Sequence, residues 1–315
     1  MDGSDRDLAL PKPSITVKTK HLYRLHKKIH ASAIVVIPTA GSLVAGILAL
    51  QSGVGAMEIS LLLSFYLLTL IGITVGFHRH FSHCSFQAYP AVRVALAILG
   101  AMACQGPLVY WVSNHRRHHQ FSDLPGDPHS PYYDGERALS GWRGFCHAHM
   151  EWTFSHEITN SFLFAKDLIK DPLISRVNQL YYAWVGLSLG LPVAIGWGST
   201  GTVEGAWLGF LWGGCVRLFL TYHFTNAIDS VTHLYGRRPF DTRENSTNNL
   251  WIALPTLGES WHNNHHAFPQ SAIFGLKGWQ VDIGGWVVRG LEALGLAWDV
   301  KRPSQDAIAA KLDCS

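Results

Sequence analysis

Long apolar segments with almost no charge place the strongest constraint on how this chain can fold. Residues 31–52 contain no Asp, Glu, Lys or Arg, and residues 56–77 contain one acid, Glu58. Each segment has the length of ~20 residues that a helix needs to cross a bilayer. A backbone in lipid must satisfy its own hydrogen bonds, which a segment of this length does as a helix. We predict membrane spans at about residues 31–52, 56–77, 178–198 and 204–226.

The order of these spans indicates two hairpins, because short links follow the first and the third. Only 15% of the residues are charged, against about 25% in an average soluble domain. Basic residues gather near the start of the chain, which the positive-inside rule places in the cytoplasm. We expect an all-α integral membrane protein with both termini and a helical cap in the cytoplasm. Its parts are a polar segment 1–30, a membrane domain 31–290 and a tail 291–315.

Two further features bear on this topology. Residues 91–110 are apolar enough for another span, but a crossing there would put two histidine clusters, at 78–83 and 114–119, on opposite faces of the membrane. We therefore interpret 91–110 as a surface helix. Arg217 lies inside the last span, where a charge facing lipid is costly, so we expect it to face protein or water.

Charge and cysteine content exclude other classes. A net charge of +3 is too small to indicate nucleic-acid binding. The five cysteines are an odd number and form no C-x-x-C pair. Neither a disulfide framework nor a thiolate zinc site is expected from this pattern.

Three histidine clusters stand beside the apolar segments: "HRHFSH" at 78–83, "NHRRHH" at 114–119 and "WHNNHH" at 261–266. In the second and third clusters the histidines are spaced i, i+3 and i+4, which places them on one face of a helix. In the first cluster the spacing leaves open which pair binds, because His78 and His83 lie roughly 140° apart on an ideal α-helix.

The number of histidines points to two metal ions. The clusters hold nine histidines, whereas one first-row ion takes at most about six ligands. Imidazole binds zinc, copper, iron and nickel, so chemistry alone leaves the metal open. Metal-bound histidines need partners for their other nitrogen, and Asp123, Asp127 and Glu259 are candidates.

With these clusters, "DPH" at 127–129 and "DSVTHLYGRRPFD" at 229–241, the chain resembles the membrane-bound fatty acyl desaturases, the histidine-box family that includes stearoyl-CoA desaturase. The resemblance covers about residues 30–290. "GFCHAHMEW" at 144–152 is closer to the bacterial branch, which implies a bacterial inner membrane.

The resemblance implies a di-iron centre and leaves His80 outside it. In relatives an Asn stands where this chain has Asp229 and approaches the second iron through water. The implied iron ligands are His78, His83, His115, His118, His119, His233, His262, His265 and His266.

The implied reaction is the O2-dependent introduction of a double bond into an acyl chain, in lipid metabolism. The substrate could be an acyl-CoA, an acyl-carrier-protein thioester or a glycerolipid, since Ser113 lacks the basic character expected of a CoA-phosphate contact. No haem-binding "HPGG" is present, so we expect a separate electron donor such as ferredoxin or cytochrome b5. Chain length, bond position and oligomeric state stay open.

Candidate residues of the acyl tunnel are Trp111, Glu151, Trp152 and Asn226. Two of them depart from the family pattern: Asn226 stands where Trp is common, and Glu151 stands where Gly is expected. We expect His129, His147, His149, His156 and His223 to support the site or the fold rather than bind metal.

Three alternatives remain open at this point. An acetylenase or a hydroxylase could use the same scaffold and act on an acyl chain bound to a carrier protein. A membrane zinc hydrolase would need one metal and no O2, but "HExxH" is absent. The third alternative is a metal- or lipid-binding protein without catalysis.

Overall fold

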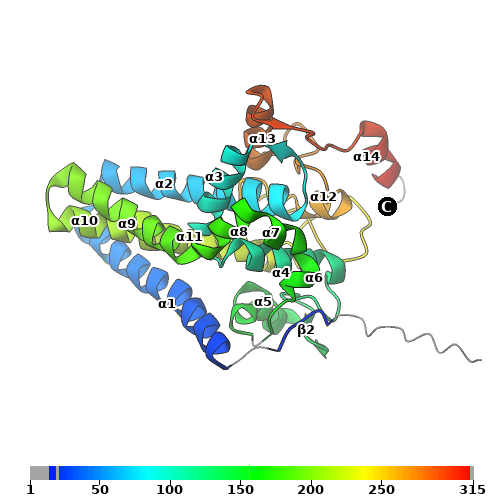
Figure 1. The fold of residues 1–315 in the computed structure, drawn as a ribbon, viewed down its shortest axis with the longest axis horizontal. Coiled ribbons are helices and arrows are strands. Elements are labelled where there is room, and N and C mark those ends of the chain that lie inside the picture. Colours follow the sequence, from blue (N-terminus) through cyan, green and yellow to red (C-terminus); the bar gives the residue numbers. More distant parts are fainter. Residues whose placement is uncertain (1–13, 19–20, 156, 313–315) are drawn as a thin grey trace, which may run out of the picture.

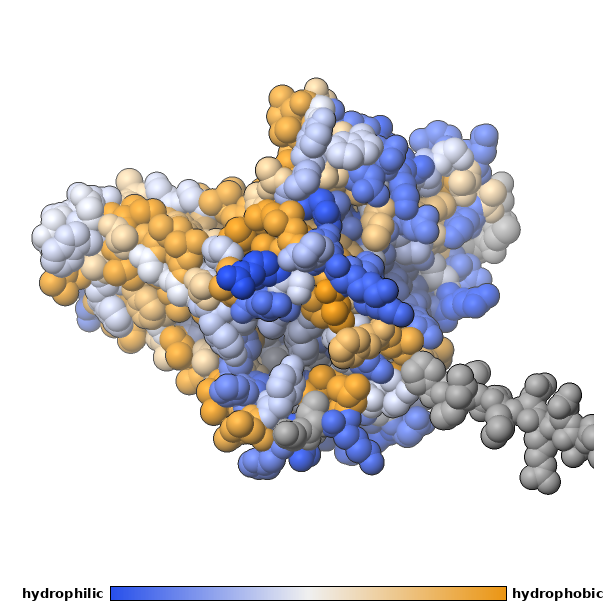
Figure 2. Space-filling model, viewed as in Figure 1, coloured by the Kyte–Doolittle hydropathy of each residue, from blue (hydrophilic) through white to orange (hydrophobic). Residues whose placement is uncertain are grey.

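The computed structural model describes residues 14–18, 21–155 and 157–312. Long helices run together at one end of the molecule, and shorter helices and loops form a cap at the other (Figure 1). Apolar side chains dominate the surface of the long helices, whereas polar residues dominate the cap (Figure 2). The exposed apolar residues of the long helices include Leu43, Ile47, Leu50, Leu63, Leu67 and Ile195. A surface of this kind suits lipid on one part of the molecule only.

The described part of the chain contains three helices long and apolar enough to cross a membrane, or four if one bent pair counts as a single span. They are α1 (His21–Ser52), α2 (Ala56–Ile71) with the π-helix η1 (Gly72–Ser82), and α10 (Val203–Gly209) with the π-helix η3 (Phe210–Val216) and α11 (Arg217–Ser230). The bent pair is α8 (Pro172–Gln179) and α9 (Tyr181–Thr200), which meet at 58°. The structure is mostly helical, which agrees with the predicted all-α class apart from four short strands.

The start of the first long helix differs from the sequence expectation. Helix α1 begins at His21, so the basic residues just before position 31 are helical. Helix α1 diverges from α2 (Figure 1) and packs against η3 and α11. A Cβ on Gly41 would lie 2.4 Å from Cys215 Sγ, so glycine permits this close approach.

The segment 91–110 does not form a span. It folds into α3 (Pro90–Ala101), a turn, and the start of α4 (Leu108–Phe121). Helix α3 has 12 residues, short of the ~20 that a crossing requires.

The cap consists of short elements, of which α6 packs against α4, α13 against η1 and α5 against α11. Strand β1 (Gln87–Ala88) pairs antiparallel with β4 (Ala297–Trp298), and β2 (Tyr133–Asp134) pairs with β3 (Arg137–Ala138). The remaining elements are α5 (Gly141–His149), the 3-10 helix η2 (Glu151–Phe154), α6 (Ser161–Phe164), α7 (Lys166–Lys170), α12 (His262–Ala267), α13 (Ile283–Ala293) and α14 (Gln305–Leu312).

Arg217 faces protein, as expected. Its side chain is fully buried, and its guanidinium donates to the carbonyl oxygens of Met102 (2.9 Å), Ser188 (3.1 Å) and Gly213 (3.0 Å) and to Ser188 Oγ (2.8 Å). Carbonyl oxygens therefore replace water around a charge inside the span.

Candidate metal centre

Eight of the nine histidines of the three clusters, all except His80, meet in two adjacent groups, and His233 joins one of them. Within each group, one ring nitrogen per histidine lies within 4.8 Å of all the others. The five-histidine group contains His78, His83, His115, His119 and His265, and the four-histidine group contains His118, His233, His262 and His266.

Helices α4 and α12 each serve both groups. On α4, His115 and His119 are one helical turn apart and enter the five-histidine group, whereas His118 enters the other. On α12, His262 and His266 share the four-histidine group, and His265 turns to the opposite one. The i, i+4 pairs follow helical geometry, and the remaining histidine of each helix ties the two groups together.

The first cluster uses a different backbone. His78 lies in the π-helix η1, and the His83 amide directly after it donates to the His78 carbonyl at 3.2 Å. In a π-helix hydrogen bonds run over five residues, so residues five apart lie one above the other. The rings of His78 and His83 are accordingly 4.9 Å apart between centroids. The backbone resolves the ambiguity that an ideal α-helix left.

Carboxylates hold the outer ring nitrogens. His118 Nδ1 and His233 Nδ1 each lie 3.0 Å from a carboxylate oxygen, of Asp127 and Asp123 respectively. His78 Nδ1 contacts Glu259. His266 Nδ1 lies 3.6 Å from Glu244. Such contacts fix the ring orientation and leave Nε2 as a lone-pair donor, as in metal sites.

The inner nitrogens fit a bound cation. Nε2 of His78 and His265 are 3.0 Å apart, and Nε2 of His233 and His262 are 3.1 Å apart. Because Nδ1 of His78 and of His233 faces a carboxylate, Nε2 of those rings carries a lone pair and cannot donate a hydrogen bond. Ligand nitrogens about 2.1 Å from a metal, at right angles to each other, are about 3 Å apart. Among the described residues, His118 Nε2 has no hydrogen-bond partner at all.

Electrostatics favour neutral imidazoles in the five-histidine group. Burial lowers the pKa of His115, His119 and His265 well below its ordinary value, and neighbouring imidazoles lower it further. Neutral imidazole is the form that binds metals. Burial also lowers the pKa of His118, but Asp127 and nearby aspartates raise it to about 9. The aspartates thus favour positive charge on the His118 ring, which a proton or, in its place, a metal ion on Nε2 would supply.

A buried arginine orients Glu259. Arg79 is fully buried, forms an ion pair with Glu259 (2.8 Å) and donates a hydrogen bond to Asp282 (2.8 Å), and its guanidinium lies over the Phe274 ring. Gly284 leaves room for it, since a Cβ there would lie 2.0 Å from Arg79 Nη1. Arg79 thus holds in place the Glu259 carboxylate that contacts His78.

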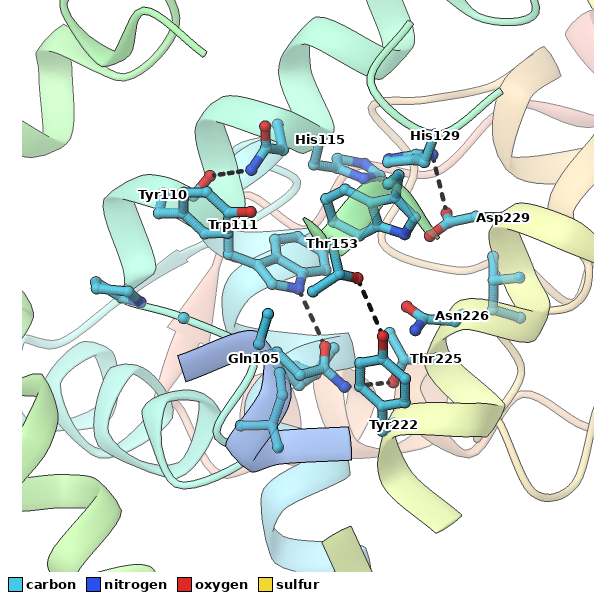
Figure 3. A pocket seen from close by; sticks show the side chains of 18 of the residues that line it. Gln105, Tyr110, Trp111, His115, His129, Thr153, Tyr222, Thr225, Asn226 and Asp229 are labelled. Carbon is cyan, nitrogen blue, oxygen red and sulfur yellow. Dashed lines mark hydrogen bonds and ion pairs between the residues drawn. The ribbon is translucent and has the colours of Figure 1, made fainter. Parts of the chain in front are cut away.

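A cavity of about 310 Å³ opens beside both groups, and His78, His115 and His262 form part of its wall. Most of the lining is apolar or aromatic (Figure 3). Gln105 Oε1 accepts from Trp111 Nε1 (3.3 Å), and Gln105 Nε2 donates to Thr225 Oγ1 (3.0 Å), which links opposite walls. The arrangement can hold an alkyl chain against the metal groups.

Residues 58–277 match the family model described as "Fatty acid desaturase". The chain belongs to the fatty acid desaturase family. This confirms the resemblance that the histidine clusters indicated, and the enzymes of this family are oxidoreductases.

Three relatives show the range of this family. The hex-5-enoyl-[acyl-carrier protein] acetylenase of Moorena producens (strain JHB) is 44% identical over 319 residues, covering 99% of this chain and 98% of the relative. The sn-1 stearoyl-lipid 9-desaturase of Anabaena variabilis is 37% identical over 248 residues, covering 78% and 84%. The icosanoyl-CoA 5-desaturase of Limnanthes douglasii is 37% identical over 258 residues, covering 79% and 66%.

The predicted tunnel residues of this desaturase-family chain divide between cavity and surface. Trp111, Trp152 and Asn226 line the cavity, whereas Glu151 is exposed and lies outside its lining. The short helix η2 turns Trp152 inward and leaves its neighbour facing out. Glu151 therefore does not contribute to a tunnel wall in this structure.

Asp229 and His129 form a contact that the sequence did not indicate. Asp229 lines the cavity, and its Oδ1 lies 3.6 Å from His129 Nδ1 (Figure 3). The His129 ring stacks on His118 at 4.6 Å between centroids. Asp229 thus reaches the four-histidine group through His129, which lies between them. Glu244 was missed entirely, because the loop that carries it has no repeating spacing to mark a ligand.

The other histidines lie outside the two groups. His80 Nδ1 is 3.1 Å from the Phe86 carbonyl, and His149 Nε2 is 3.0 Å from His223 Nδ1. His147 is buried on α5. His156 falls outside the described residues.

Proposed function

We propose that this protein is an O2-dependent di-iron desaturase that introduces a double bond into an acyl chain. The observation that carries the proposal is the pair of histidine groups, with inner nitrogens about 3 Å apart, against an apolar cavity. Two irons held by the nine histidines would supply O2 activation and hydrogen abstraction.

The chain's own residues supply binding and orientation. An alkyl chain has no polar handle at mid-length, so an apolar wall must position it. His78 and His115 reach that wall from the five-histidine group and His262 from the other. The bonds of Gln105 to Trp111 and Thr225 fix the shape of the cavity between its walls. Walls of this kind also exclude water from the reacting carbon.

A carrier-protein thioester is the substrate that the comparisons favour. The relative from Moorena producens matches over nearly the whole of both chains, and its name denotes a hex-5-enoyl group on acyl carrier protein. The stearoyl-lipid and icosanoyl-CoA relatives match over less of this chain. The same observation favours a second candidate, an acetylenase that oxidises an alkene to an alkyne on the same scaffold.

The remaining parts of the proposal concern the partner and the membrane. Electrons come from a separate donor such as ferredoxin or a small cytochrome. The chain is a multi-pass protein of the bacterial inner membrane, with the cap and both termini in the cytoplasm. Its parts are the segment 1–30, the desaturase domain 31–290 and the tail 291–315.

One experiment tests the function. The protein is expressed in a host of known lipid composition, iron and zinc are quantified by mass spectrometry, and hexanoyl and hexenoyl carrier-protein thioesters are offered with a ferredoxin system. A mass loss of two with two irons per chain supports desaturation or acetylenation, and a gain of sixteen supports hydroxylation. One zinc without iron overturns the proposal.

A second experiment tests the topology. Cysteines replace Glu136, in the exposed turn between β2 and β3, and Val54, in the link between α1 and α2. A membrane-impermeant maleimide should label Glu136→Cys only from the cytoplasmic side and Val54→Cys only from the opposite side, with the parent protein as background. Labelling of both from one side would contradict the four-span topology.

A further inference from the structure

The cavity wall contains two polar groups without partners. Among the described residues, Asn226 Nδ2 and Trp152 Nε1 are buried and have no hydrogen-bond partner. Asn226 is 4% exposed. Buried polar groups nearly always have a hydrogen-bond partner, so two unpartnered nitrogens on one cavity indicate a ligand.

Nδ2 is the atom of the Asn226 amide that lacks a hydrogen-bond partner among the described residues. Figure 3 shows the side chain between Tyr222 and Asp229, directed into the cavity. The Tyr222 hydroxyl is bonded to Thr153 Oγ1 at 3.0 Å, and Asp229 faces His129 at 3.6 Å. An amide can present N–H or C=O, but an indole N–H can only donate. The pair therefore suits an acceptor oxygen.

The position of this pair relative to the metal groups limits which oxygen it can bind. Trp152 lies 5.0 Å from the His129 ring, and the His129 ring stacks on His118 of the four-histidine group. Asn226 precedes Asp229 by three residues, less than one turn of α11. Both donors thus lie beside the four-histidine group rather than at a remote cavity end.

We propose that Asn226 and Trp152 bind the carbonyl oxygen of the acyl thioester, and so hold the carbonyl beside the metal centre. The inference rests on the proposed function, because it assumes an acyl substrate in this cavity. A hydrocarbon tail offers no acceptor, and the carbonyl is the oxygen nearest the chain. The carbons presented to the metal groups are then those close to the carbonyl, which selects short chains and positions the oxidised bond by counting from the carbonyl.

Binding of two substrate analogues tests the carbonyl contact without turnover. Hexanoyl-pantetheine amide keeps the carbonyl, and hexyl-pantetheine thioether lacks it. The wild-type protein should bind the amide at least tenfold more tightly. Asn226→Leu and Trp152→Phe should each reduce that preference below threefold, because each removes one donor; Leu keeps the branched shape of Asn, and Phe keeps an aromatic ring that is smaller than indole. Gln179→Leu, an exposed amide on α8, should keep the wild-type preference.

Two results would overturn the proposal. One is equal affinity of the wild-type protein for the amide and the thioether, which would mean that the donors hold water instead. The other is an unchanged preference in both variants. The melting temperature and metal content of each variant show whether it folds, and the wild-type measurement stands even if neither variant does. Absence of iron or of any dehydrogenated product would instead defeat the proposed function, so the two failures are separable.

Product analysis gives an independent readout. Six- and eight-carbon thioesters should be oxidised at the same distance from the carbonyl, and Asn226→Leu should scatter the bond over neighbouring positions. Oxidation at a constant distance from the methyl end would contradict carbonyl binding.

Discussion

The two histidine groups have similar inner surfaces and different outer surfaces. The five-histidine group has one carboxylate contact on its outer nitrogens, from Glu259 to His78. The four-histidine group has contacts from three carboxylates among the described residues, those of Asp127, Asp123 and Glu244. Carboxylates make imidazole ligands more basic and fix their orientation. The difference indicates that two metals bound here would be electronically unequal, with the more negative surroundings at the four-histidine group.

Removal of one ligand from each group should have the largest effect. His118→Ala and His265→Ala are each expected to abolish turnover, and each should lower the metal content chiefly in its own group. Mass spectrometry of the purified variants, with product analysis, measures both. If either variant kept two metals and full activity, the division into two groups would be wrong.

Loss of one carboxylate should have an intermediate effect. We expect Asp127→Asn to weaken metal binding by about 10–100-fold, measured by chelator competition. Glu259→Gln should do the same and also lower the melting temperature more, because Arg79 would keep Asp282 as its only carboxylate partner and a poorly compensated buried charge is costly. Equal melting temperatures would contradict this role for the arginine.

A larger side chain in the cavity should change selectivity rather than metal content. Asn226→Trp fills part of the wall near the four-histidine group, so the preferred acyl chain should become shorter while both metals stay bound. Competition between acyl thioesters of different length measures this. An unchanged product profile would mean that this wall does not contact the chain.

Glu244→Gln should have the smallest effect. Its carboxylate lies 3.6 Å from His266 Nδ1, longer than a hydrogen bond, so we expect a loss of metal affinity below about tenfold. The same chelator titration as for Asp127→Asn gives a direct comparison, and a larger loss than in that variant would reverse the ranking.

The sequence predicted the helical class, the apolar helices and the histidine clusters, because periodicity and spacing are local properties. It did not predict the π-helix that brings His78 and His83 together, since hydrogen bonding over five residues leaves no mark in hydropathy. Glu244 and the contact of Asp229 with His129 were also missed. Both depend on loops meeting in space, which spacing along the chain cannot report.

The burial of Arg217 bears on how the protein is made. An arginine at the centre of a lone helix costs about 2.5–3.5 kcal/mol to insert into a membrane. Two of its acceptors, at Met102 and Ser188, lie on earlier segments and so leave the ribosome first. When the last span enters the bilayer, the carbonyl groups that accept hydrogen bonds from Arg217 have therefore already been synthesised. Biogenesis of this protein is then ordered, with the final helix inserting as a partner of earlier segments rather than alone.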